Sequence, residues 1–121
     1  MSEARQSLGK LGEDLACQEL QRRGYAILAR RYRRRGGELD IVARDGQTIV
    51  FVEVKTREGG EFGAGAESVT WFKRRRMASV AQDYLLRHRL VDCPCRFDVV
   101  SIDMGEQPAR IELYQNAFDV G

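Results

Sequence analysis

The stretch GELDIVARDGQTIVFVEVKTR, residues 37–57, decides the fold that we expect for this chain. Asp45 and Gly46 separate two apolar runs, and this dipeptide in that setting is the strongest short signal for a β-hairpin. We expect strands over residues 38–44 and 48–56, joined by a two-residue loop with Arg44 and Gln47 at its flanks. This hairpin would form the centre of a sheet.

Three charged side chains interrupt the apolar hairpin: Asp40, Glu53 and Lys55. Strand side chains alternate between faces, so Glu53 and Lys55 share one face. The expected loop places Asp40 opposite Phe51 and diagonal to Glu53, on that same face. A three-residue loop without a bulge would instead turn Asp40 to the other face.

Carboxylates on a central strand repel each other and lose hydration unless positive charge compensates them. Lys55 supplies one charge, and oxygen ligands from Asp40 and Glu53 suit Mg²⁺ or Mn²⁺ as a cofactor rather than zinc. The alternative is an ordinary surface ion pair between Glu53 and Lys55.

Further elements are expected on both sides of the hairpin. Helical patterns cover residues 7–23 and 70–89, the second with Thr70 as its cap, and strand patterns cover 25–32, 96–103 and 110–114. Residues 58–67 are rich in glycine and predict a loop. The order is α-β-β-β-α-β-β, which favours one α/β domain over residues 1–121, with a mixed central sheet flanked by helices.

Each predicted helix carries one charged residue that is a candidate for the hairpin site. Glu13 lies on a ridge with Gly9 and Ala16, where it is either a solvent-exposed acid or a third acid beside Asp40. Lys73 lies four residues before Met77, on the edge of the apolar stripe, and either leans toward the site or extends into solvent.

Basic residues are clustered although the net charge is only +2. Clustered Arg and Lys favour a polyanionic partner, because they release counterions from phosphates, and the alternative is a solvated charged face. The candidate nucleic-acid-binding residues are Arg30, Arg31, Arg33, Arg34, Arg35, Lys73, Arg74 and Arg75.

The composition restricts the class of protein further. A chain of 121 residues that is 43% hydrophobic can bury one ordinary core. Its three cysteines, without a signal peptide, favour the reducing cytoplasm. No apolar run approaches the roughly 20 residues of a spanning helix, so no membrane partner is expected.

Taken together, the motifs GKLGEDLA (9–16), GELDIVARDG (37–46), VFVEVKTR (50–57), Lys73 and RFDVV (96–100) resemble the YraN-like family of the PD-(D/E)xK nuclease superfamily. That resemblance implies a restriction-endonuclease-like αβββαβ core and similarity to archaeal Holliday junction resolvases. It implies Asp40 and Glu53 as metal ligands, Lys55 as the partner of water or scissile phosphate, and Glu13 as an outer or second-metal acid. Leu39 stands where the superfamily's name has proline.

The function expected from residues and resemblance is metal-dependent endonucleolytic hydrolysis of nucleic acid, with branched or structured DNA favoured over RNA. Superfamily nucleases often pair to cut both strands, which makes a homodimer a further expectation. The rivals are a nucleic-acid-binding adaptor with a vestigial site, which would not need Mg²⁺, and a structural domain whose basic patches bind protein.

Overall fold

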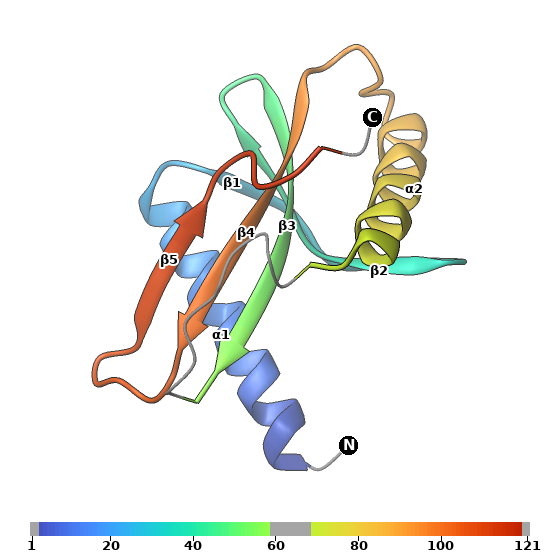
Figure 1. Cartoon of the computed structure of the whole chain (residues 1–121). Coiled ribbons are helices and arrows are strands. Elements are labelled where there is room, and N and C mark those ends of the chain that lie inside the picture. Colours follow the sequence, from blue (N-terminus) through green and yellow to red (C-terminus); the bar gives the residue numbers. More distant parts are fainter. Residues whose placement is uncertain (1–2, 59–68, 120–121) are drawn as a thin grey trace.

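The structure is a computed structural model that describes residues 3–58 and 69–119. Seven elements follow one another in the order helix, three strands, helix, two strands (Figure 1). They are α1 (Glu3–Arg22), β1 (Ala26–Arg34), β2 (Gly37–Asp45), β3 (Thr48–Arg57), α2 (Trp71–Arg87), β4 (Cys95–Asp103) and β5 (Arg110–Tyr114).

The five strands form one mixed sheet in the order β1-β2-β3-β4-β5. Strands β1, β2 and β3 pair antiparallel, β3 and β4 pair parallel, and β4 and β5 pair antiparallel. The parallel pair is connected through α2, since parallel neighbours need a crossover. The expected α/β class is therefore confirmed, and the architecture is compatible with a restriction-endonuclease-like core.

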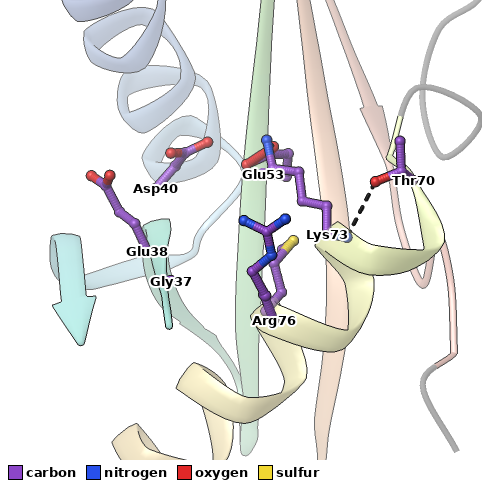
Figure 2. Close-up of a pocket in the computed structure, with 8 residues that line it drawn as sticks. Gly37, Glu38, Asp40, Glu53, Thr70, Lys73 and Arg76 are labelled. Atoms are coloured by element: carbon purple, nitrogen blue, oxygen red, sulfur yellow. Dashed lines mark hydrogen bonds and ion pairs between the residues drawn. The ribbon is translucent and has the colours of Figure 1, made fainter. Parts of the chain in front are cut away.

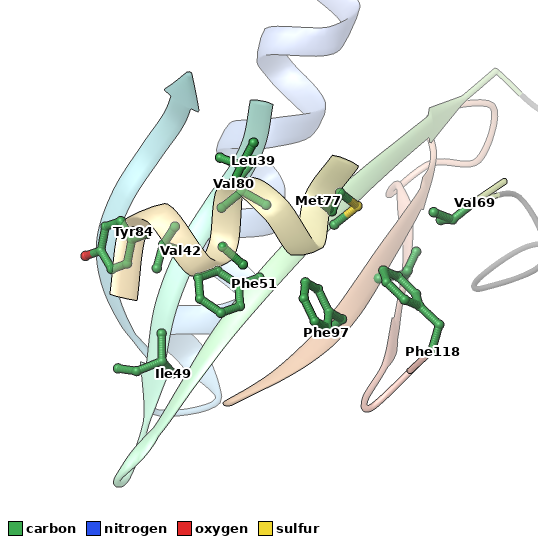
Figure 3. Packing of buried hydrophobic residues seen from close by; sticks show 12 residues of the cluster. Leu39, Val42, Ile49, Phe51, Val69, Met77, Val80, Tyr84, Phe97 and Phe118 are labelled. Carbon is green, nitrogen blue, oxygen red and sulfur yellow. The ribbon is translucent and has the colours of Figure 1, made fainter. Parts of the chain in front are cut away.

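The two helices cover opposite faces of the sheet, and each face has its own core. Under α2, Leu39, Phe51, Met77, Val80 and Tyr84 belong to one buried cluster (Figure 3). Under α1, a second cluster joins helix and sheet residues: Ala16, Leu20, Ile41, Val50, Val52, Val100 and Ile102. Because β3 contributes to both clusters, the hairpin lies at the centre of the fold, as the sequence predicts.

The bounds of the elements agree with the sequence predictions to within a few residues. Strand β5 has the predicted bounds, and Thr70 is the N-cap of α2, its Oγ1 accepting a hydrogen bond from the Lys73 backbone N–H at 3.2 Å. The predicted glycine-rich loop lies outside the described residues apart from Glu58. Within the described ranges no helix has the length and apolar character needed to cross a membrane.

The hairpin loop differs from the prediction by one position. Asp45 pairs with Thr48, so the loop is Gly46-Gln47 rather than Asp45-Gly46. Gly46 has φ of +62° and takes the first loop position, where a type II′ turn needs glycine, whereas the predicted loop would require positive φ at the aspartate as well. The strands consequently pair two positions away from the expected register, with Val42 rather than Asp40 opposite Phe51. A shift of two leaves every side chain on its predicted face.

Candidate metal and phosphodiester site

The hairpin ladder ends at the point where the predicted acids lie. Pairing runs from Asp45 and Thr48 to Ile41 and Val52, and the next residues are Asp40 and Glu53. Asp40 then takes over the hydrogen bonding with its side chain, because its Oδ2 accepts the Val54 backbone N–H at 2.8 Å. One carboxylate therefore satisfies a backbone donor that a regular ladder would have paired, and this bond holds the Asp40 carboxylate against β3.

Glu53 is the buried charge of the site. Its side chain is on a central strand, and the residue is only 2% exposed. Its Oε2 is ion-paired with the amino group of Lys73 and lies 3.6 Å from Nζ of Lys55. Both amines contact that oxygen, so a cation that bound there would compete with Lys73 and Lys55.

Helix α2 brings Lys73 to the sheet. The Thr70 cap fixes the first turn, and the stripe of Met77, Val80, Ala81 and Tyr84 buries the same side of the helix. Gly37, at the start of β2, allows the close approach, because a Cβ there would lie 3.1 Å from Val80 Cγ2 and 3.5 Å from Arg76 Cβ. The first residues of β2 are thus held beside α2.

A pocket of about 380 Å³ opens between β2, β3 and the start of α2. Figure 2 shows Glu38 and Asp40 entering it from β2, Glu53 from β3, and Lys73 and Arg76 from α2. Gly37, Thr70 and Met77 complete its lining. The pocket therefore combines acids from the two strands of the hairpin with bases from α2.

The electrostatics of the site follow from burial and from the proximity of the charges. Burial, followed by interaction with the Glu53 carboxyl group, raises the pKa of Asp40 to about 8. Burial, together with the charge of Lys73, lowers the pKa of Lys55. Burial alone would also lower the pKa of Lys73, but the hydrogen bond and charge of Glu53 outweigh it and raise that pKa. The two carboxyl groups thus compete for positive charge.

This donor set fits a hard divalent cation. Asp40 and Glu53 provide carboxylate oxygens, which suit Mg²⁺ or Mn²⁺, and both side chains line the same pocket. Over residues 3–58 and 69–119, no cluster of three or more Asp, Glu, His or Cys side chains is placed to hold a metal. Mg²⁺ commonly retains several waters and needs only one or two carboxylates, so a pair of acids suffices.

Comparison with known proteins shows where this chain belongs. The model of the uncharacterised protein family UPF0102 matches residues 12–102. The chain belongs to this family. It is 50% identical over 120 residues to the UPF0102 protein of Geobacter metallireducens, covering 99% of this chain and 98% of that protein. It is 47% identical over 112 residues to a UPF0102 protein of Symbiobacterium thermophilum, covering 92% and 95%. It is 42% identical over 120 residues to the UPF0102 protein of Pseudomonas aeruginosa, covering 97% and 96%.

In this UPF0102 protein, Glu13 accepts hydrogen bonds from two arginines of β1. Its carboxylate accepts from Arg30 Nε at 3.2 Å and from Arg31 Nε at 3.3 Å. Both arginines reach the same acid although strand neighbours normally alternate, because Arg31 has φ of +52° and breaks the alternation. Glu13 is 7% exposed and links α1 to β1; its role as a second-metal acid stays a prediction.

The predicted nucleic-acid-binding residues are in different environments. Arg30 also binds Asp14 at 2.6 Å, and Arg34 binds Asp83 at 3.0 Å. Arg33 Nε lies 3.4 Å from a carboxylate oxygen of Glu38, which lines the pocket, and Arg35 is exposed in the turn between β1 and β2. On α2, Arg74 donates to the Val69 carbonyl, and Arg75 lies over the Trp71 ring.

Two residues that line the pocket of this UPF0102 protein were not predicted to lie beside the acid pair. Glu38 lies two residues before Asp40, and Arg76 lies three residues after Lys73. Both spacings are signals, since residues two apart share a strand face and residues three apart share a helix face. Neither residue belongs to the pattern of Asp40, Glu53 and Lys55 that defined the predicted site.

Asp98, a residue of the RFDVV motif, belongs to a different network. It is fully buried and accepts from Arg96 Nε at 3.0 Å and from the Asn116 backbone N–H at 2.9 Å. Arg96 also donates to Tyr25 and Asp45. The network ties the end of the hairpin to β4 and to the segment after β5, and its contacts indicate a structural role.

Proposed function

We propose that this UPF0102 protein is a metal-dependent phosphodiesterase acting on nucleic acid, with DNA favoured over RNA. The observation that supports the proposal most directly is that Asp40, Glu53 and Lys73 line one pocket and that Lys55 lies 3.6 Å from Glu53, so two carboxyl groups from neighbouring strands lie next to two amines. Family membership is compatible with this activity but names no reaction.

Asp40 and Glu53 are the residues that would hold the cation. Both residues are held in place, the Asp40 carboxylate by its bond to the Val54 N–H and Glu53 by its position on a buried strand. A bound Mg²⁺ or Mn²⁺ would polarise a phosphoryl oxygen and lower the pKa of an attacking water.

The amines have separate tasks in this proposal. Lys55 lies 3.6 Å from Glu53 and about a quarter of its side chain is exposed, so its amino group can meet a phosphate at the mouth of the site and stabilise charge that develops there. Its lowered pKa reflects the cost of holding a charge in this position. Lys73 holds Glu53 in orientation, and Arg76, in the same lining, presents a guanidinium that matches a phosphate group.

The experiment is a cleavage assay with purified full-length protein on four-way, flapped and supercoiled DNA and on RNA, with Mg²⁺ or Mn²⁺. We expect Glu53→Gln and Lys55→Ala to lower the rate by about a hundredfold or more. Glu58→Gln, an exposed acid just beyond the same strand, is the matched control and should retain the rate. Cleavage that persists in both site variants would show a contaminating nuclease.

A second function, that of a nucleic-acid-binding adaptor without hydrolysis, is favoured by one observation. Glu53 already has two amines as charge partners, so the site is compensated without a cation. The adaptor predicts binding that EDTA does not change and no cleavage by the wild type with any metal or substrate. The same assay therefore decides between the two functions.

A further inference from the structure

Two large aromatic side chains are exposed at the beginning of α2. Trp71 is 65% exposed and Phe72 is 69% exposed. Their rings contact each other edge to face, with centroids 5.1 Å apart and planes at 80°. Exposing two adjacent aromatic rings to water is unfavourable, and a contiguous exposed apolar patch often marks a binding surface.

These rings are not on the side of α2 that packs against the sheet. The buried side of α2 is formed by Met77, Val80, Ala81 and Tyr84. Trp71 instead lies one helical turn before Arg75, whose guanidinium carbon is 5.6 Å from the centre of the indole ring. This cation–π contact orients the indole on the solvent side of the helix.

The aromatic pair adjoins the acidic pocket. Thr70, which precedes Trp71, and Lys73, which follows Phe72, both line the pocket that contains Asp40 and Glu53. The Lys73 amino group pairs with Glu53 itself. A ligand on the rings is therefore within one helical turn of the site.

The charge around the rings selects the chemistry of the ligand. Residues 73–76 are Lys-Arg-Arg-Arg, and the first turn of α2 contains no acid. An uncharged apolar partner would match only the rings, whereas a polyanion that carries flat rings matches both the rings and the positive charge beside them. Nucleic acid with unpaired bases has that chemistry, because every exposed base has a face that stacks on an aromatic side chain.

We propose that Trp71 and Phe72 form a stacking platform for unpaired nucleobases, with phosphates held by the adjacent basic run. The site then takes single-stranded or branch-point segments in preference to uninterrupted duplex. The substrate class rests on the proposed function, but the stacking itself is a binding property that is measured without hydrolysis.

The test compares a thymidine oligonucleotide with an abasic oligonucleotide of the same length, both bound to the full chain in EDTA. The two ligands carry the same phosphates, so their difference reports the bases alone. We expect the base-bearing strand to bind about five- to a hundredfold more tightly to the wild type. Because Trp71 is the only tryptophan of the chain, its fluorescence should be quenched by the thymidine strand and not by the abasic one.

Variants connect the preference to the rings. In the double variant Trp71→Ala/Phe72→Ala the two strands should bind equally, while Trp71→Tyr, which retains a flat ring, should keep the preference. Leu86→Ala removes another exposed apolar side chain, 61% exposed, from the far end of the same helix and is the matched control. Circular dichroism of each variant verifies the fold.

Equal binding of the two strands by the wild type, or an unchanged preference in the double variant, would overturn the stacking platform. Two further results would overturn it if the wild type shows no base preference. Self-association that is lost in the double variant would assign the rings to a contact with a second copy of the chain. Vesicle binding that is lost in the double variant would assign them to a lipid surface. Failure of stacking leaves cleavage by the wild type intact, whereas failure of the proposed function leaves the base preference intact. The two failures are therefore distinguishable.

Discussion

The amino group of Lys73 on α2 pairs with Oε2 of Glu53 on β3, so the buried carboxylate of the candidate metal site already has a cation from the helix as its partner. Residue 53 is almost fully buried, and Lys55 is its other charge partner, 3.6 Å away. This pair links the second helix to the chemistry of the hairpin. It also places an amine in direct competition with any cation for the same oxygen.

Lys73→Ala should therefore strengthen divalent-cation binding while it weakens the metal-free fold. Removing one amine leaves Glu53 less compensated, which favours a cation, and costs about 1–3 kcal/mol of unfolding free energy without metal. Titration calorimetry with Mn²⁺ and urea unfolding in EDTA measure the two effects. Lys10→Ala, an exposed lysine of α1, is the control and should change neither; weaker Mn²⁺ binding in Lys73→Ala would contradict the competition.

Asp40→Asn should change how stability depends on pH. In the metal-free protein the pKa of Asp40 is raised to about 8 from an ordinary value of 3.8. A group with a raised folded pKa contributes stability that is fully present below the unfolded pKa and is lost as the pH rises through the folded one. In EDTA, the wild type should therefore lose stability between about pH 4 and pH 8, and Asp40→Asn should lose less.

At pH 8.5 we expect Asp40→Asn to be the more stable protein in EDTA, by up to about 6 kcal/mol, since the pKa of Asp40 rises from 3.8 to about 8 and each pKa unit corresponds to about 1.4 kcal/mol. Urea unfolding at half-unit pH steps measures the difference. Asp92→Asn, at an exposed position, serves as the matched control and should follow the wild type. Parallel pH profiles for the wild type and Asp40→Asn would show that Asp40 does not titrate in this range.

Gly12→Ala should destabilise the protein although alanine favours a helix. A Cβ at residue 12 would lie 2.2 Å from Thr56 Oγ1 and 3.1 Å from Thr56 Cβ, so α1 would have to move away from β3. We expect a loss of about 1–3 kcal/mol by thermal or urea unfolding. Gly9→Ala, in the same helix with nothing within 4 Å of the new Cβ, should be neutral or stabilising. Equal effects of the two substitutions would rule out the close approach.

Arg96→Met should destabilise strongly, because it leaves the fully buried Asp98 without its cation. Breaking a buried pair from one side typically costs about 3–5 kcal/mol. Arg22→Met removes an exposed partner of Glu19 and should cost less than about 1 kcal/mol. Urea unfolding compares the two; a small loss in Arg96→Met would show that the network around Asp98 is not structural.

The arginines of β1 should separate into two groups. Arg33, Arg34 and Arg35 lie at the end of the strand and in the turn, so replacing them with alanine should lower the slope of log K against log salt for duplex DNA by up to about 0.9 per lost phosphate contact. Arg30→Ala/Arg31→Ala breaks contacts with Glu13 and Asp14 and should mainly lower stability. Fluorescence anisotropy over a salt series and urea unfolding measure the two effects. Unchanged DNA binding in the triple variant would count against the basic patch.

The extent to which the sequence predicts the site is clearest at the hairpin. The alternation of β3 places Glu53 and Lys55 on one face whatever the register, and the predicted face of Asp40 holds because the true loop shifts the pairing by two positions and not by one. The loop itself was predicted wrongly, because the preference for asparagine or aspartate before glycine is statistical and the type II′ turn places Gly46 first.

Residues outside the hairpin were less predictable. Glu13 was expected to be either a solvent-exposed acid or a third acid beside Asp40. It is buried, and its contacts with Arg30 and Arg31, which the sequence did not predict, depend on a backbone irregularity at residue 31. The close approach of α1 to Thr56 of β3 at Gly12 was not predicted either. In both cases the partner lies on another element, so local periodicity carries no information about it.

The sequence by itself determined the order of the elements, the central hairpin and the common face of Asp40, Glu53 and Lys55, because these follow from side-chain periodicity and turn chemistry within about twenty residues. Only the tertiary structure decided that Lys73 and Arg76 join the acids, that Glu38 lines the same pocket and that Glu13 binds two arginines. The reason is physical: these contacts depend on how each helix packs on a twisted sheet, and the packing is set by the fit of all buried side chains together.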